Sequence, residues 1–234
     1  MAETVPMKII ARIHTDFSTK FGIPRQSGLV DELEGTVVFA PEYRVPEALR
    51  GLEGFSHIWL LWQFSRAVRE DWSPTVRPPR LGGNERMGVF ATRSPYRPNA
   101  IGLSCVRLAG VDLHTPRGPV LRVAGADLMD GTPIFDIKPY LPYADCRPDA
   151  VGGFASAPAG ERLRVVFAPG CLERVPEGRG EALRGVLACD PRPGYQSDPG
   201  RVYGLSFGGV DVRFTVTGET LTVVDVVPGG GEMR

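Results

Sequence analysis

The chain has 234 residues, of which 42% are hydrophobic and 23% are charged. This composition supplies a proper core for one large domain or two modest ones, and it excludes a wholly disordered chain. No apolar run approaches the roughly 18 residues of a membrane span, and residues 1–6 lack a basic region followed by an apolar stretch. These features predict a soluble cytoplasmic protein with no membrane segment and no signal peptide.

Positive charge is concentrated in one part of a chain whose formal net charge is zero. Of the 27 basic residues only three are lysines, and residues 66–107 carry eight arginines against three acids, a local net charge of +5. The planar guanidinium donates two hydrogen bonds in parallel to a phosphate or a carboxylate. The pattern therefore favours an anionic partner for this stretch.

Metal and disulfide chemistry are disfavoured. The four cysteines are far apart in the sequence, none forms a C-x-x-C pair, and only three histidines could join them. Two aspartates that later motifs single out, Asp130 and Asp136, have no cluster of further carboxylates or histidines beside them in the sequence, which disfavours a metal-dependent nuclease. We expect no metal site and four buried, reduced thiols.

The first 140 residues alternate short apolar segments with turns. We expect strands at 7–13, 34–39, 57–64, 87–92, 101–108 and 120–123, a short helical segment at 46–52, and a loop at 71–84. The strand at 57–64 is apolar enough to be buried on both faces. So many short strands with few helices predict an antiparallel barrel or sandwich. The absence of β-α-β alternation, G-x-G-x-x-G and a P-loop disfavours a Rossmann or nucleotide-hydrolase fold.

A second, smaller domain follows a linker. Residues 151–160 are rich in small residues and proline, as linkers are. Beyond them we expect strands at 163–167, 202–207, 210–217 and 220–227 and one helix at 180–189. The sequence thus predicts a β-barrel domain at 1–152 and a small α+β domain at 160–234.

Two prolines stiffen the segment at 92–102, which holds Arg93, Arg97 and Asn99 on a loop between strands. This arrangement is typical of a loop that recognises a charged, hydrogen-bonding ligand. The alternative is a surface loop with solvated arginines.

The segment at 130–142 places Asp136, Lys138 and Tyr140 at every second position, which puts them on one face of an extended chain. A carboxylate beside an ammonium is either a satisfied ion pair or an acid–base set. His57, in an apolar strand, is expected to be a buried structural histidine rather than a base.

Two further segments hold an arginine next to proline, at 22–26 with Arg25 and at 190–195 with Arg192. Each is a weak signal alone. For Asp190 and Arg192, a salt bridge that closes the two domains together is the alternative to a role in binding.

Taken together and in order, these segments resemble the TrmO (TsaA, YaeB-type) family over nearly the whole chain. The motifs that carry the resemblance are Pro24-Arg25-Gln26, the run from Gly54 to Trp59, Arg77-Pro78-Pro79-Arg80, the run from Arg93 to Asn99, Asp130-Gly131-Thr132-Pro133, Asp136 to Tyr140, and Asp190 to Pro193. The resemblance implies a mainly β fold, with a TsaA-like single-sheet barrel, a small α+β C-terminal domain and a homodimer. It also implies an S-adenosylmethionine-dependent methyltransferase that acts on the tRNA anticodon loop, at N6 of N6-threonylcarbamoyladenosine 37.

By the same resemblance, the residues expected to contact S-adenosylmethionine are Pro24, Arg25, Gln26, Arg93, Leu103, Asp130, Gly131, Thr132 and Pro133. A further contact falls just after the strand at 57–64, where bacterial relatives carry a His-Gln pair and this chain has Ser65 and Arg66. We assign proton removal to Asp136, with Lys138 and Tyr140 either orienting it or holding the substrate. We assign tRNA contacts to Arg77, Arg80, Arg97, Asn99, Asp190 and Arg192.

One functional alternative belongs to a different class, a non-catalytic barrel that binds RNA or a small ligand. Its arginines would contact phosphates, as in other basic nucleic-acid-binding surfaces. Such a protein would not bind S-adenosylmethionine, so a cofactor-binding measurement separates the two.

Overall fold

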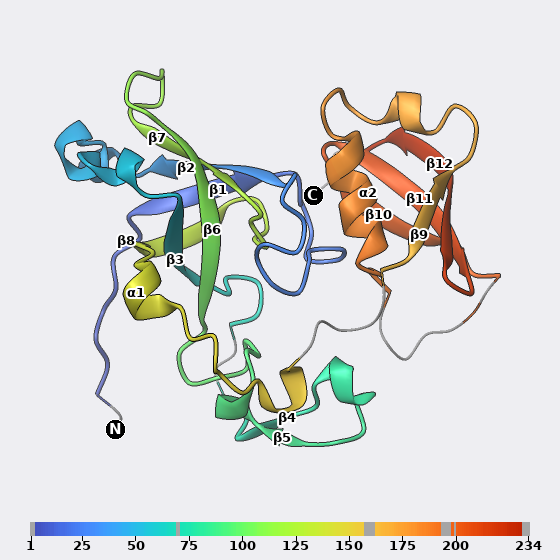
Figure 1. Cartoon of the computed structure of the whole chain (residues 1–234), viewed down its shortest axis with the longest axis horizontal. Helices are drawn as coiled ribbons and strands as arrows, with labels where there is room; N and C mark the ends of the chain where they lie inside the picture. Colours follow the sequence, from blue (N-terminus) through green and yellow to red (C-terminus); the bar gives the residue numbers. More distant parts are fainter. Residues whose placement is uncertain (1–2, 69–70, 157–161, 193–197, 199, 231–234) are drawn as a thin grey trace.

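The computed structural model describes residues 3–68, 71–156, 162–192, 198 and 200–230. Six strands close into one antiparallel barrel in the order β1-β2-β7-β6-β3-β8 (Figure 1). They are β1 (Ala11–Thr15), β2 (Glu34–Phe39), β3 (His57–Gln63), β6 (Ile101–Asp112), β7 (Val120–Ala124) and β8 (Thr132–Pro139). The expected mainly β fold with a single-sheet barrel is confirmed. Across the described ranges, no helix has the length and apolar character needed to cross a membrane.

The barrel closes around alternating side chains. Ile13, Val37 and Leu60 are completely buried, and their neighbours along each strand face outward. Closure leaves no free sheet edge among these strands, so every wall of the barrel has one face on the core and one face outside.

Trp62 belongs to this core, and its indole occupies space that is free only because the residue opposite it is a glycine. Trp62 pairs with Gly102, and a Cβ added to Gly102 would lie 2.3 Å from Cε2 of the indole. The indole Nε1 donates a hydrogen bond to Oγ of the buried Ser104 at 3.0 Å. The ring is thereby fixed both by packing and by its polar atom.

Gly102→Ala is expected to lower the free energy of unfolding by about 1–3 kcal/mol, because the methyl group displaces the indole. Chemical denaturation measures the change. Gly54→Ala, in the segment that precedes β3 and with nothing within 4 Å of the added Cβ, is the control and should be close to neutral. An unchanged midpoint for Gly102→Ala would contradict the packing described here.

The second unit is a four-stranded sheet covered by a helix. Its strands are β9 (Arg164–Phe167), β10 (Tyr203–Phe207), β11 (Val210–Thr217) and β12 (Thr220–Pro228), in the order β10-β11-β12-β9 with β9 parallel to β12. The helix α2 (Gly180–Ala188) buries Leu183, Val186 and Leu187 against this sheet. The unit has the α+β character expected from the sequence.

The loop between β1 and β2 joins the two units. Phe17, Val30 and Leu33 pack in the core of the second unit rather than in the barrel core, and the rings of Phe17 and Phe207 meet edge to face at 5.4 Å. Arg179 forms ion pairs with Asp16 at 3.2 Å and with Glu34 at 2.9 Å. The loop at 16–33 is therefore fixed to the second unit both by apolar packing and by ion pairs.

The remaining elements are short. They are β4 (Thr75–Val76), β5 (Met87–Gly88), α1 (Pro142–Asp145) and the 3-10 helices η1 (Pro41–Tyr43), η2 (Pro46–Leu49), η3 (Leu52–Gly54), η4 (Pro79–Leu81), η5 (Val89–Ala91), η6 (Gly153–Ala155) and η7 (Leu172–Arg174). The helical segment expected at 46–52 is thus two 3-10 turns, and η6 lies in the linker expected at 151–160, of which 157–160 fall outside the described residues.

Several expectations need correction. The first strand begins at Ala11 rather than Met7, because regular pairing with Phe39 and Ile134 starts there. The strand expected at 87–92 ends at Gly88, since Val89 bonds to Pro74 and the chain turns into η5.

The strand at 57–63 alternates buried with half-buried residues instead of being buried on both faces, because one face of a barrel wall points outward. Of the four thiols, all free, only Cys171 is buried, and Cys146 is exposed.

Candidate functional site at one rim of the barrel

Three loops leave the same rim of the barrel and carry most of the predicted site residues. The register places the end of β1 beside the start of β8, the end of β3 beside the start of β6, and the start of β2 beside the end of β7. The loops at 16–33, 64–100 and 125–131 therefore all emerge at this end, which we call the rim. Antiparallel closure thus gathers segments that are far apart in the sequence.

Gln26 and Arg93 meet at the rim. Nη1 of Arg93 donates a hydrogen bond to Oε1 of Gln26, although the two residues are 67 positions apart. The loop that carries Gln26 is tied to the barrel by the Gly28 N–H, which donates to the Gly125 carbonyl at 2.9 Å. Pro24 is buried, while Arg25 is exposed and its guanidinium makes no hydrogen bond or ion pair within the described part of the chain.

Asp127 lies near Arg93 and the Ser27 backbone, and it is not among the site residues expected from the sequence. Its Oδ1 accepts a hydrogen bond from Oγ of Ser104 at 2.6 Å, and the backbone N–H of Ser27 donates to the same carboxylate. Burial raises the pKa of Asp127, while the Ser104 hydrogen bond and the nearby Arg93 oppose that rise. The one sequence signal was an acidic residue within the apolar run at 120–128.

The turn at 129–132 is rigid. Oδ1 of Asp130 lies 3.1 Å from Nδ1 of His14 and accepts the Thr15 N–H at 3.1 Å. Oγ1 of the buried Thr132 donates to the Met129 carbonyl, and Arg12 donates to the Gly131 carbonyl at 2.7 Å. The expected contacts at 130–133 thus lie at the same rim, held by β1.

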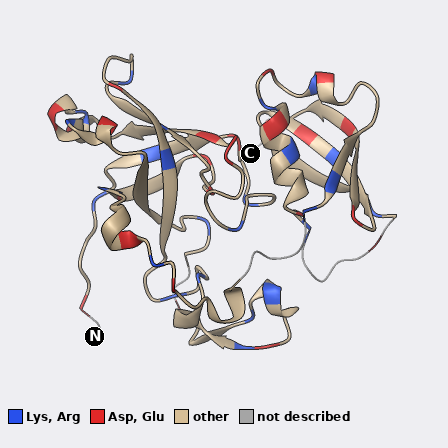
Figure 2. Ribbon diagram, in the orientation of Figure 1, with Lys and Arg blue, Asp and Glu red and all other residues tan. Residues whose placement is uncertain are grey.

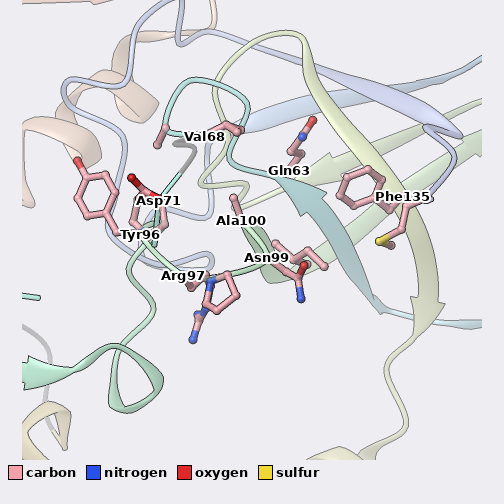
Figure 3. Close-up of a pocket in the computed structure, with 13 residues that line it drawn as sticks. Gln63, Val68, Asp71, Tyr96, Arg97, Asn99, Ala100 and Phe135 are labelled. Atoms are coloured by element: carbon pink, nitrogen blue, oxygen red, sulfur yellow. The ribbon is translucent and has the colours of Figure 1, made fainter. Parts of the chain in front are cut away.

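A cavity of about 200 Å³ opens beside the rim on the outer side of β3, β6 and β8 (Figure 3). Figure 3 shows Gln63 and Phe135 on the strand side, and Asp71 and Tyr96 across from them. Arg97 and Asn99 line the cavity, which brings two predicted tRNA contacts to one place. Ser65 and Arg66 follow directly after β3 and are exposed.

Asp136 lies next to this cavity on the outer face of the barrel. The register places Asp136, Leu61 and Leu103 in one row across three strands, adjacent to the row of Gln63 and Ile101 that lines the cavity. Leu103 is 48% exposed there, although it is a leucine in the middle of a sheet. The outward face thus continues the cavity along the sheet.

The Asp136 carboxylate pairs with Lys138 at 2.8 Å, and both side chains keep substantial exposure to solvent. Tyr140 lies farther along the same face, with its ring 5.9 Å from Trp59 and 6.2 Å from His57. The expected common face is confirmed, and the ion pair is present. His57 is half-buried rather than buried, and Ser56 Oγ lies 3.0 Å from its Nδ1.

Other predicted residues lie away from the cavity. Arg77 and Arg80 are on the segment around β4 and η4. Asp190 and Arg192 form a two-point ion pair, with both N–O distances 2.8 Å, across one turn of the second unit. The alternative, in which a salt bridge of this pair closes the two domains together, is wrong, because Asp190 and Arg192 pair with each other in the same turn. Arg179 makes the ion pairs to the barrel side instead.

The described residues contain no group of three or more His, Cys, Asp or Glu side chains placed to hold a metal ion. The rim instead offers guanidinium, amide and carboxylate groups on rigid loops, which suits an organic ligand with charged ends.

These features define a class: a closed antiparallel barrel with three polar loops gathered at one rim, and not a Rossmann fold. Two family models match the chain, the tRNA-methyltransferase O N-terminal domain over residues 12–146 and the TrmO C-terminal domain over residues 161–229. The chain belongs to the TrmO family.

Individual relatives agree with this assignment. The chain is 43% identical over 228 residues to the tRNA (adenine(37)-N6)-methyltransferase of Escherichia coli, covering 94% of this chain and 96% of that protein. It is 46% identical over 163 residues to the enzyme of the same name from Eikenella corrodens, covering 69% and 91%. A crystal structure of TrmO from Pseudomonas aeruginosa matches with a TM-score of 0.80 at 36% identity, covering 96% of this chain and 99% of that one. The resemblance noted in the sequence is therefore confirmed.

The raised pKa of Asp127 predicts a pH-dependent stability difference between the unaltered protein and Asp127→Asn. The folded carboxyl keeps its proton to a higher pH than the unfolded one, which titrates near 3.8. Ionisation of Asp127 therefore lowers the free energy of unfolding as pH rises through the window above that value. Asparagine has no such loss, so the stability of the variant relative to the unaltered protein should rise with pH.

Urea denaturation from about pH 4 to about pH 7 measures this difference. Asp149→Asn, at an exposed carboxyl, is the matched control. A difference between Asp127→Asn and the unaltered protein that stays constant with pH would contradict the raised pKa.

Proposed function

We propose that this protein is an S-adenosylmethionine-dependent methyltransferase that acts on N6 of N6-threonylcarbamoyladenosine at position 37 of tRNA. The observation that carries the proposal is the meeting of Gln26 and Arg93 at the rim, which joins the two loops expected to hold the cofactor. The family assignment and the relatives named tRNA (adenine(37)-N6)-methyltransferase support the coarser part of the proposal, methyl transfer to N6 of adenine 37 in tRNA.

The donor groups at the rim fit the cofactor. S-adenosylmethionine ends in an amino-acid carboxylate, for which the guanidinium of Arg25 or Arg93 is a suitable partner. The Gln26 amide is held by Arg93 and can bind either a donor or an acceptor of the ligand. When bound, the cofactor supplies an activated methyl group on a sulfonium, which requires no metal.

The acceptor nitrogen sets the demands on the protein. N6 of adenine is a weak nucleophile because its lone pair is delocalised into the purine. In the threonylcarbamoyl form the neighbouring carbonyl weakens it further but makes its proton easier to remove. Positioning of the base and removal of this proton are therefore the two tasks of the residues around the cavity.

Asp136 is our candidate for the group that takes the proton. It lies one row from the cavity, and its exposure leaves it accessible to a substrate. Lys138, 2.8 Å away, orients the carboxylate and stabilises its charge before the proton arrives. Tyr140, whose ring lies tilted at 41° to that of Trp59, is farther along the face and serves substrate binding rather than proton transfer.

We assign most of the contacts with tRNA to arginine side chains. We assign Arg97 and Asn99, which line the cavity, to the modified nucleotide, and Arg77 and Arg80 to the anticodon loop. Asp190 and Arg192 remain candidates for contacts from the second unit. We also infer that the protein acts in the cytoplasm, where tRNA is matured, and as a homodimer, as the resemblance to the family implies.

Isothermal titration calorimetry with S-adenosylmethionine tests the cofactor assignment. We expect binding to the unaltered protein and a rise in Kd of about 10-fold or more in Arg93→Ala, because a charge-assisted hydrogen bond is lost. Arg117→Ala, in the loop at the opposite rim, should bind normally. If the folded, unaltered protein does not bind the cofactor, the result favours the alternative of a non-catalytic barrel that binds RNA or a small ligand.

Asp136→Asn keeps the shape of the side chain but removes its basicity. Turnover of tRNA should fall by roughly 10²–10⁴ while the affinities for cofactor and tRNA stay within a few fold. Transfer of a labelled methyl group to tRNA measures the rate. If Asp136 only pairs with Lys138, then Lys138→Met and Asp136→Asn should cost similar stability and turnover should stay near normal, which would remove Asp136 from the mechanism.

A further inference from the structure

A pair of aromatic side chains lies open to solvent on the segment that projects from the rim. The rings of Trp72 and Phe90 are stacked with centroids 6.1 Å apart and an interplanar angle of 23°. Trp72 is 49% exposed and Phe90 is 73% exposed. Both belong to residues 71–92, which we call the arm, and Figure 1 shows the arm around β4 and β5 extending away from the barrel.

The arm holds this pair by its own short contacts. Thr75 and Val76 pair with Gly88 and Met87, and the Val89 N–H donates to the Pro74 carbonyl at 3.0 Å. Trp72 precedes the first of these strands and Phe90 follows the second. The two rings are thus brought together by a small antiparallel ladder and not by burial in a core.

The pair also has a fixed relation to the cavity. The Ser73 N–H donates to the Tyr96 carbonyl at 3.3 Å, and Tyr96 lines the cavity together with Asp71, the residue before Trp72. A ligand lying across Trp72 and Phe90 is therefore beside the entrance to the cavity.

The charge of the arm and the adjoining loop is complementary to a polyanion. Residues 71–97 carry five arginines against two acids. Arg77 and Arg80 form no ion pair with any residue that the structure describes, and Arg86 donates to Oγ1 of Thr75 at 2.9 Å rather than to a carboxylate. Figure 2 shows basic residues on the arm, apart from the mixed charges of the second unit.

We propose that Trp72 and Phe90 form a stacking platform for an unpaired base of the tRNA anticodon loop next to the base that enters the cavity. Exposed aromatic faces flanked by unpaired arginines are what single-stranded nucleic acid requires, since bases stack on the rings while guanidinium groups contact the phosphates. The inference rests on the proposed function for the identity of the RNA. It adds the surface that holds the loop while N6 is presented.

The test compares Trp72→Ala, Phe90→Ala and the double variant with Tyr143→Ala, which removes another exposed aromatic ring, 85% exposed, from outside the arm. Steady-state methylation gives KM for tRNA and kcat, and calorimetry gives Kd for S-adenosylmethionine. We expect KM for tRNA to rise roughly 10-fold for each substitution in the arm, with kcat at saturating tRNA and cofactor Kd within about two-fold. Trp72→Phe, which keeps a ring, should restore most of the affinity, and Tyr143→Ala should behave as the unaltered protein.

A direct binding measurement separates this inference from the proposed function. Fluorescence anisotropy with an anticodon stem-loop and with a fully paired duplex of the same length needs no methylation. The arm variants should lose affinity for the stem-loop and keep the weaker affinity for the duplex. If the unaltered protein methylates no tRNA but the arm variants still lose affinity for the stem-loop, the platform stands and the proposed function fails.

Three results would overturn the platform. The first is unchanged binding of the stem-loop by the double variant. The second is a loss of kcat without a change in KM, which would mean that the pair only shapes the cavity. The third is a change of oligomeric state in sedimentation, which would assign the two rings to contact with a second copy of the chain.

Discussion

The hydrogen-bonded chain from Trp62 through Ser104 to Asp127 connects the packing of the barrel to the geometry of its rim. The indole packs where Gly102 leaves room, its Nε1 donates to Ser104, and Ser104 in turn donates to the carboxylate of Asp127. Asp127 then receives the backbone N–H of Ser27, next to Gln26. A partly buried carboxylate with several donors resists displacement, because a lost partner leaves a costly unsatisfied group.

Closure of the barrel brings the loops that carry the candidate site residues to one rim. Pairing of β1 with both β2 and β8 brings the loops at 16–33 and 125–131 together, and pairing of β3 with β6 brings the two ends of the loop at 64–100 to the same rim. Arg93 and Gln26 thus meet across 67 positions of sequence. The groups proposed to bind the cofactor lie at the rim, and the proposed base lies on the adjoining outer face. We propose that methyl donor and acceptor base meet at the cavity beside them.

The local sequence pattern was sufficient to predict where strands lie, but it was insufficient to predict which of their faces are buried. Alternation identified residues 34–39 as a strand and 210–217 as another, both with the observed bounds. It placed Asp136 and Lys138 on one face because that depends only on a period of two. It could not show that the strand at 57–63 has one face outside, which requires knowledge of closure. Asp127 escaped notice because its importance comes from Ser104 and Ser27, which are distant in sequence, and Trp72 and Phe90 were assigned to a loop and a strand with no sign that their rings meet.

We propose that the rim and its cavity methylate one modified nucleoside in tRNA. Nucleoside mass spectrometry tests it most directly, with tRNA that carries N6-threonylcarbamoyladenosine and the same tRNA transcribed without modification, each incubated with the protein and S-adenosylmethionine. The account predicts a gain of one methyl group on the threonylcarbamoyl nucleoside, and no gain on the unmodified adenosine. Methylation of the unmodified transcript at an equal rate, or no methyl transfer to either tRNA by a protein that binds the cofactor, would contradict it.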